Sequence, residues 1–158
     1  MIPAADLDRA LRREAELIGE VRAALAAQRA AVAADDIERV ELSVQAVGRT
    51  LLVLDEARRR RAAIATLASG REVGSLAELE AAWDGPMPLS LREACAAVRR
   101  EAEAAASEAR VNQAVLRGAL DAADAYLQHL FTAADPTPVY QPATRRTEPV
   151  ARLVDRTA

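Results

Sequence analysis

The longest pattern of apolar positions in the chain runs from Leu91 to Leu130 and alternates in steps of four and three. This spacing is typical of the buried seam of a coiled-coil-like helix. Because a helix rises about 1.5 Å per residue, such a helix would be roughly 60 Å long, which favours a binding surface over an enzyme domain. The seam comprises Leu91, Cys95, Val98, Ala102, Ala105, Ala109, Asn112, Leu116, Ala119, Ala123, Tyr126 and Leu130.

Two earlier segments carry the same spacing and predict two more long helices. The first covers about residues 6–34, and two of its seam positions hold Glu14 and Gln28. The second follows Asp35, which we predict to cap it in a capping box with Glu38. It should end at residues 69–70, because glycine is favoured just past a helix C-terminus. Its apolar stripe comprises Ile37, Val40, Val44, Val47, Leu51 and Leu54.

Residues 70–90 predict a short crossover between the second and third long helices. Ser75 and Glu78 form a capping box for a short helix that ends at Trp83. We expect Trp83 to pack over this crossover, since a large aromatic side chain contributes much buried area. After an Asp-Gly-Pro break, Ser90 and Glu93 are predicted to cap the third long helix.

Together these segments predict an all-α fold. We expect an elongated antiparallel three-helix bundle, coiled-coil-like, with a short helical crossover and a disordered C-terminal tail. Antiparallel neighbours follow from the two-residue connection at 35–36. Residues 1–134 would form the bundle domain, and residues 135–158, which are rich in proline, a flexible tail.

Composition and charge narrow the classes of function. The formal net charge of −3 argues against an electrostatic nucleic-acid partner. Charged residues interrupt the N-terminal segment before it could form a signal peptide, and no stretch is apolar enough for insertion in a membrane. We therefore expect a cytoplasmic protein. Cys95 is the single cysteine and is interpreted as a buried seam thiol.

The residues that usually carry catalysis are sparse, so we predict no enzyme activity, no metal and no other cofactor. His129 is the single histidine and fits a surface position near a helix end. The arginine run 58–61 spreads around a helix, which favours a solvated helix end over a phosphate site.

The last third of the third helix carries more apolar residues than one seam needs, which is typical of a partner-binding face. The alternative interpretation is that these apolar residues belong to the core and are covered by the first two helices. Asn112 fits two interpretations equally, a buried amide that fixes register or an amide that faces a partner chain. The candidate residues for binding a substrate protein are Val111, Asn112, Val115, Leu116, Leu120, Leu127 and Leu130.

Three motifs, in this order, resemble the FlgN-type flagellar export chaperones over residues 7–142. The first is the Leu-Leu segment LLVLDEARRRR, which leads into an arginine-bearing stretch. The second lies in SEARVNQAVLRGALDAADAYLQHL, where Asn112 precedes Val115 and Leu116. The third is PTPVY, which places Tyr140 after the last helix, with Gln141 where many members have glycine.

The resemblance implies a chaperone that binds hook–filament junction proteins of the FlgK and FlgL type and keeps them unassembled before export. It also implies binding through the C-terminal region, docking of Tyr140 at the export gate protein FlhA, and no ATP hydrolysis by the chaperone. The alternative is a structural homodimeric coiled-coil protein whose apolar surplus is its self-association seam and which has no export role.

Overall fold

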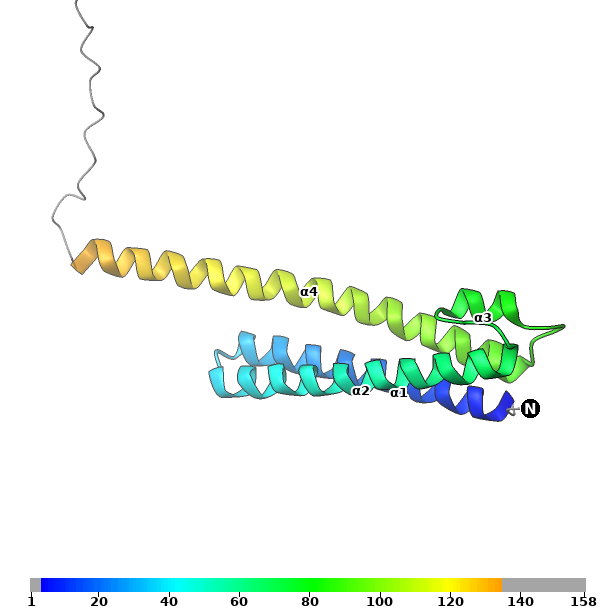
Figure 1. Cartoon of the computed structure of the whole chain (residues 1–158). Coiled ribbons are helices and arrows are strands. Elements are labelled where there is room, and N and C mark those ends of the chain that lie inside the picture. Colours follow the sequence, from blue (N-terminus) through cyan, green and yellow to red (C-terminus); the bar gives the residue numbers. More distant parts are fainter. Residues whose placement is uncertain (1–3, 135–158) are drawn as a thin grey trace, which may run out of the picture. The chain divides into compact units, whose positions relative to one another are not determined.

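In the computed structural model, which describes residues 4–134, every regular element is a helix (Figure 1). Helices α1 (Ala4–Ala33) and α2 (Ile37–Ser69) are joined by a tight turn, and the short α3 (Leu76–Ala82) leads to α4 (Leu89–Ala134). The predicted all-α class is confirmed. The chain divides into two units, Met1–Ala123 and Asp124–Ala158.

The turn between α1 and α2 is set by two consecutive aspartates. Asp35 has a left-handed φ of 54°, and Asp36 is the N-cap whose side chain accepts a hydrogen bond of 3.0 Å from the backbone N–H of Arg39. The predicted cap at Asp35 with Glu38 was therefore wrong by one residue. Since Arg39 occupies the position three residues after the cap, a reciprocal capping box is not formed there.

The end of α2 and the start of α3 follow the sequence prediction. Gly70 has a left-handed φ of 67°, and its N–H donates to the Thr66 carbonyl at 2.9 Å. Ser75 and Glu78 make the predicted capping box, in which the Glu78 carboxylate accepts from the N–H groups of Ser75 and Gly74 at 3.0 and 2.7 Å. These local contacts fix the crossover.

Helix α4 begins one residue earlier than the predicted cap. It starts at Leu89, and the carbonyl of Pro88 already accepts from the N–H of Arg92 at 3.1 Å. The prediction that Ser90 caps this helix was therefore wrong. Pro88 has no backbone N–H, so it adds no unpaired donor at this helix start.

One core in the first unit joins the N-terminal half of α1, the C-terminal half of α2, α3 and the start of α4. Cys95 is fully buried in it, and Trp83 packs against it, as predicted. Aliphatic side chains make up most of this core, as expected where aromatic residues are 3% of the chain. Its largest fully buried side chains are Leu7, Leu11, Leu17, Leu79, Leu91, Val73 and Cys95.

The N-terminal half of α2 departs from the predicted bundle. Leu54 is buried, and Val40 and Val47 are half-buried, but Ile37, Val44 and Leu51 are exposed. The predicted stripe is therefore split along its length. The row of Val40, Val47 and Leu54 turns toward α1. The row of Ile37, Val44 and Leu51 has no covering helix within the part of the chain that the structure describes.

In the second unit the structure describes the end of α4, residues 124–134. Residues 124–133 are all exposed. The proposed domain boundary at residue 134 coincides with the last described residue. The predicted tail, from residue 135 onward, lies outside the described residues.

Candidate functional site

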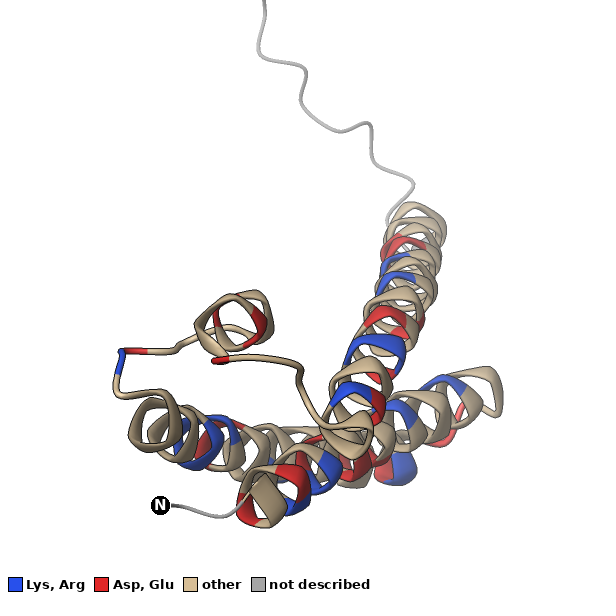
Figure 2. Cartoon of the chain, turned by 90° about the vertical axis from the view of Figure 1, so that its right-hand side faces the viewer, with Lys and Arg blue, Asp and Glu red and all other residues tan. Residues whose placement is uncertain are grey.

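A ladder of ion pairs fixes how α4 lies against α1 in the first unit. Arg22 binds Glu101 and Arg29 binds Glu108, each with an N–O distance of 2.7 Å. On both helices the paired residues are seven apart, so the two helices run parallel in one coiled-coil register. Figure 2 shows acidic and basic residues interspersed along the helices, as such pairing requires.

The ladder ends at a buried pair of amides. Asn112 is 3% exposed and Gln28 is 7% exposed, and the Asn112 Nδ2 donates to the Gln28 Oε1. The Asn112 Oδ1 is buried and has no hydrogen-bond partner among residues 4–134. Of the two interpretations of Asn112, this geometry matches the amide that fixes register, because its side chain faces α1.

Past Asn112 the seam of α4 is no longer buried in the first unit. Leu116 is half-buried, and Ala119 and Ala123 are exposed. Helix α1 ends at Ala33, five residues after the amide partner Gln28. The seam of α4 therefore has no buried position after Asn112 in the part of the first unit that the structure describes.

The candidate residues other than Asn112 are all at least partly accessible. In the first unit Val111 is 49% and Leu120 67% exposed, while Val115 and Leu116 are half-buried. The core alternative, in which helices one and two cover this stretch, therefore does not hold for Val111 and Leu120. In the second unit Leu127 and Leu130 are exposed as well.

Sequence reasoning left two sets of exposed apolar residues out of the candidate site. In the second unit these are Tyr126 and Phe131, which are 64% and 73% exposed. In the first unit they include a row on α2 made of Ile37, Val44 and Leu51. The seven-residue spacing of the α2 row is visible in the sequence, but it equally fits a core position.

The arginine run after Leu54 is partly a core element, so its prediction as a solvated helix end was wrong for Arg61. Arg61 is 5% and Glu14 is 3% exposed, and the Arg61 Nε donates to the Glu14 Oε2 at 2.6 Å. Arg58 reaches the other carboxylate oxygen at 3.2 Å. The interruption of the α1 stripe at Glu14 is thus a buried charge that α2 neutralises.

The described residues offer little that resembles a catalytic centre. No group of three or more His, Cys, Asp or Glu side chains within residues 4–134 is placed to hold a metal ion. Burial raises the pKa of the Cys95 thiol, which favours the unreactive protonated form. None of the helices in the described ranges is long and apolar enough to cross a membrane.

Comparison with known proteins gives one match. The family model described as FlgN protein matches residues 1–148 of the chain. No curated protein and no solved structure matches significantly.

Proposed function

The chain belongs to the FlgN family, and from this premise we propose that it binds hook–filament junction proteins of the FlgK and FlgL type in the cytoplasm. Membership in the family carries the general role of a flagellar export chaperone. In the proposal, binding keeps the junction proteins from premature assembly, and the chaperone delivers them to the export gate. No step requires a catalytic residue, a metal or a cofactor.

The observation that carries the proposal is the loss of cover along α4. Asn112 is the last seam residue of α4 that is buried; beyond it Leu116 is half-buried, and Leu120, which lies beside the seam, is 67% exposed. Exposed apolar side chains at helical spacing are the surface that an amphipathic partner helix needs. The junction protein would lay its apolar stripe along these accessible residues of α4.

The proposed substrate-binding residues divide into two roles. In the first unit Val111, Val115, Leu116 and Leu120 would contact the partner directly, and in the second unit Leu127 and Leu130 are proposed contacts. Asn112 would not contact the partner itself. It would hold α4 in register on α1, because any other register would leave its buried amide unpaired. The contacts would follow the three- and four-residue spacing typical of helix recognition.

We propose that Tyr140 acts in delivery of the junction protein to the export gate, because the PTPVY segment resembles the corresponding segment of FlgN-type chaperones. Tyr140 lies outside the described residues. In the proposal its ring docks on the cytoplasmic domain of the gate protein FlhA, since one aromatic anchor can dominate a small interface.

The experiment that tests this function uses the full chain and a C-terminal fragment of a junction protein from the same genome. Size-exclusion chromatography with light scattering measures the mass of each protein alone and of the mixture. A mixed species of defined stoichiometry supports the chaperone proposal. The absence of a mixed species at concentrations of tens of micromolar contradicts it.

The second candidate is a structural homodimeric coiled-coil protein. The row of exposed residues at seven-residue spacing on α2, Ile37, Val44 and Leu51, favours it, because such a row also suits a second copy of the chain. Size-exclusion chromatography with light scattering also distinguishes the chaperone from the structural homodimer. A stable dimer that does not take up the junction fragment would support the structural alternative.

A further inference from the structure

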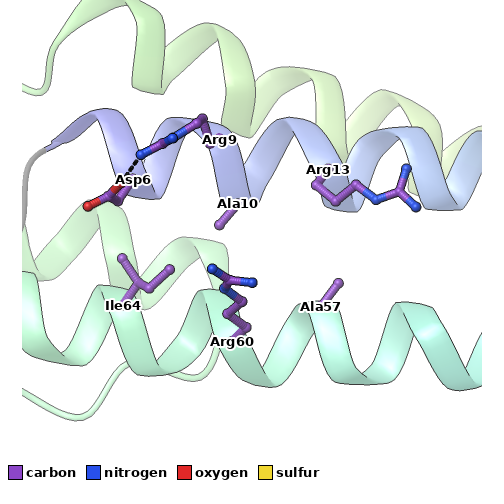
Figure 3. Close-up of a pocket in the computed structure, with 7 residues that line it drawn as sticks. All are labelled: Asp6, Arg9, Ala10, Arg13, Ala57, Arg60 and Ile64. Atoms are coloured by element: carbon purple, nitrogen blue, oxygen red, sulfur yellow. Dashed lines mark hydrogen bonds and ion pairs between the residues drawn. The ribbon is translucent and has the colours of Figure 1, made fainter.

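A groove of about 540 Å³ lies between α1 and α2, away from the proposed substrate residues (Figure 3). Helix α1 contributes Asp6, Arg9, Ala10 and Arg13 to its walls. Helix α2 contributes Ala57, Arg60 and Ile64. All seven residues belong to the first unit.

Three apolar side chains line the groove between the two helices. Ala10 comes from α1, and Ala57 and Ile64 come from α2, on either side of Arg60 in Figure 3. Ala57 and Ile64 also pack against the core, so this part of the floor is held in place. The floor of the groove is therefore apolar, and its α2 side is held in place by packing against the core.

The rim of the groove is basic in a chain whose net charge is negative. It carries three guanidinium groups and one carboxylate. Arg60 makes no ion pair within residues 4–134. The guanidinium of Arg60 extends from α2 toward α1 in Figure 3.

The two arginines of α1 have only exposed partners on their own helix. Arg9 binds Asp6, and Arg13 binds Glu16 and Glu20 at 3.1 and 3.4 Å, with all of these side chains at least 36% exposed. Exposed pairs of this kind contribute little and exchange readily. Arg13 is therefore free to turn to an incoming carboxylate.

We propose that this groove binds an acidic segment of a partner protein. Carboxylates of the segment would pair with Arg60 and Arg13, and an apolar side chain between them would rest on Ala10, Ala57 and Ile64. Arginine suits this role because its planar fork binds a carboxylate through two hydrogen bonds. The site lies on α1 and α2, so it extends the proposed function by a second binding surface and does not depend on the residues of α4.

A protein partner fits the groove better than a nucleic acid. The basic rim is short and is bordered by Glu16 and Glu20. A long phosphate backbone would meet these carboxylates and the net negative charge of the chain, whereas a short acidic peptide would meet only the rim.

The test measures binding of a fluorescent, end-blocked peptide of sequence Glu-Leu-Glu-Glu-Leu-Glu to the full chain by anisotropy. The same peptide with glutamine in place of glutamate separates charge from apolar contact. The variants are Arg60→Gln and Arg13→Gln. The matched control is Arg49→Gln, which removes an exposed charge of α2 that does not line the groove.

We expect Arg60→Gln to weaken binding at least about tenfold, Arg13→Gln to weaken it less, and Arg49→Gln to leave it unchanged. The glutamine peptide should bind much more weakly to the unchanged chain. Equal losses for Arg60→Gln and Arg49→Gln would overturn the proposal, because binding would then follow overall charge. It would also be overturned by no binding at millimolar peptide, or by tighter, Arg60-dependent binding of a single-stranded oligonucleotide of equal charge.

Discussion

The Asn112 amide of α4 donates a hydrogen bond to the side-chain oxygen of Gln28 on α1, and both side chains are buried. This pair is the last buried contact of α4 within residues 4–134. On its N-terminal side the seam includes the buried residues Leu91, Cys95 and Val98, and on its C-terminal side in the first unit Leu116 is half-buried and Ala119 and Ala123 are exposed. The pair therefore separates a packing half of the helix from the proposed binding half.

Replacing Asn112 by alanine should destabilise the fold, because the buried oxygen of Gln28 would lose its donor. A buried polar group without a partner costs about 1–3 kcal/mol. We expect a loss of that size in the free energy of unfolding, measured by urea denaturation and far-UV circular dichroism. Gln113→Ala is the matched control, since Gln113 is an exposed amide one residue away. Equal effects of the two substitutions would contradict a structural role for the pair.

Removing one partner of the Glu14–Arg61 pair should have a larger effect. Both charges are buried, so Glu14→Ala leaves an uncompensated guanidinium in the core, and breaking a buried pair typically costs about 3–5 kcal/mol. Arg58→Ala is the control, because Arg58 is half exposed and should cost less than about 1 kcal/mol. The double variant Glu14→Leu/Arg61→Met should recover much of the loss in thermal denaturation. A double variant less stable than Glu14→Ala would count against this explanation.

The start of α3 should weaken in acid. The N–H groups of Gly74 and then Ser75 hold the pKa of Glu78 below its ordinary value of 4.5. Because the folded pKa is depressed, the stabilising contribution is complete above the unfolded pKa and is lost as pH falls through the folded pKa. Amide exchange in residues 76–82 should therefore become less protected below about pH 4.5, and Glu78→Gln should remove this pH dependence. If amide exchange in residues 76–82 of Glu78→Gln still became less protected in acid, the effect would not come from the Glu78 carboxylate.

The sequence predicted features set by neighbouring residues more reliably than features set by contacts between helices. The Ser75–Glu78 box and the stop at Gly70 depend on residues a few positions apart, and both are confirmed. The cap at Asp36 was missed because two adjacent aspartates offer the same chemistry, and only the backbone angle at Asp35 distinguishes them.

Contacts between helices could not be read from periodicity alone. Glu14 and Gln28 interrupt a stripe in the sequence, yet each is buried against a polar partner 47 or 84 residues away. The same limit applies to α2, where one apolar stripe gives both a half-buried row and an exposed row. Which row is covered depends on how α2 packs against α1, and apolar spacing carries no such information.

Tyr140→Ala should separate delivery from substrate binding. In the proposed function this residue contacts the export gate, so its loss should leave the melting temperature and binding to the junction protein nearly unchanged. Binding of the chaperone–substrate complex to the cytoplasmic domain of FlhA should weaken, because an aromatic anchor is removed. Loss of junction-protein binding instead would place Tyr140 in the substrate site. Unchanged binding to both partners would contradict any role for it.

The most direct test of the proposed binding face is calorimetric titration of a junction-protein fragment into Leu120→Asp and Leu67→Asp. Both substitutions place an aspartate in a helix at a leucine of similar exposure, 67% for Leu120 and 69% for Leu67. Their effects on folding should be small and alike. We predict that Leu120→Asp weakens binding at least about tenfold, because a carboxylate would be buried in an apolar contact, and that Leu67→Asp binds like the unchanged chain. Normal binding by Leu120→Asp, or equal losses in both variants, would contradict the assignment of this face of α4 to the substrate.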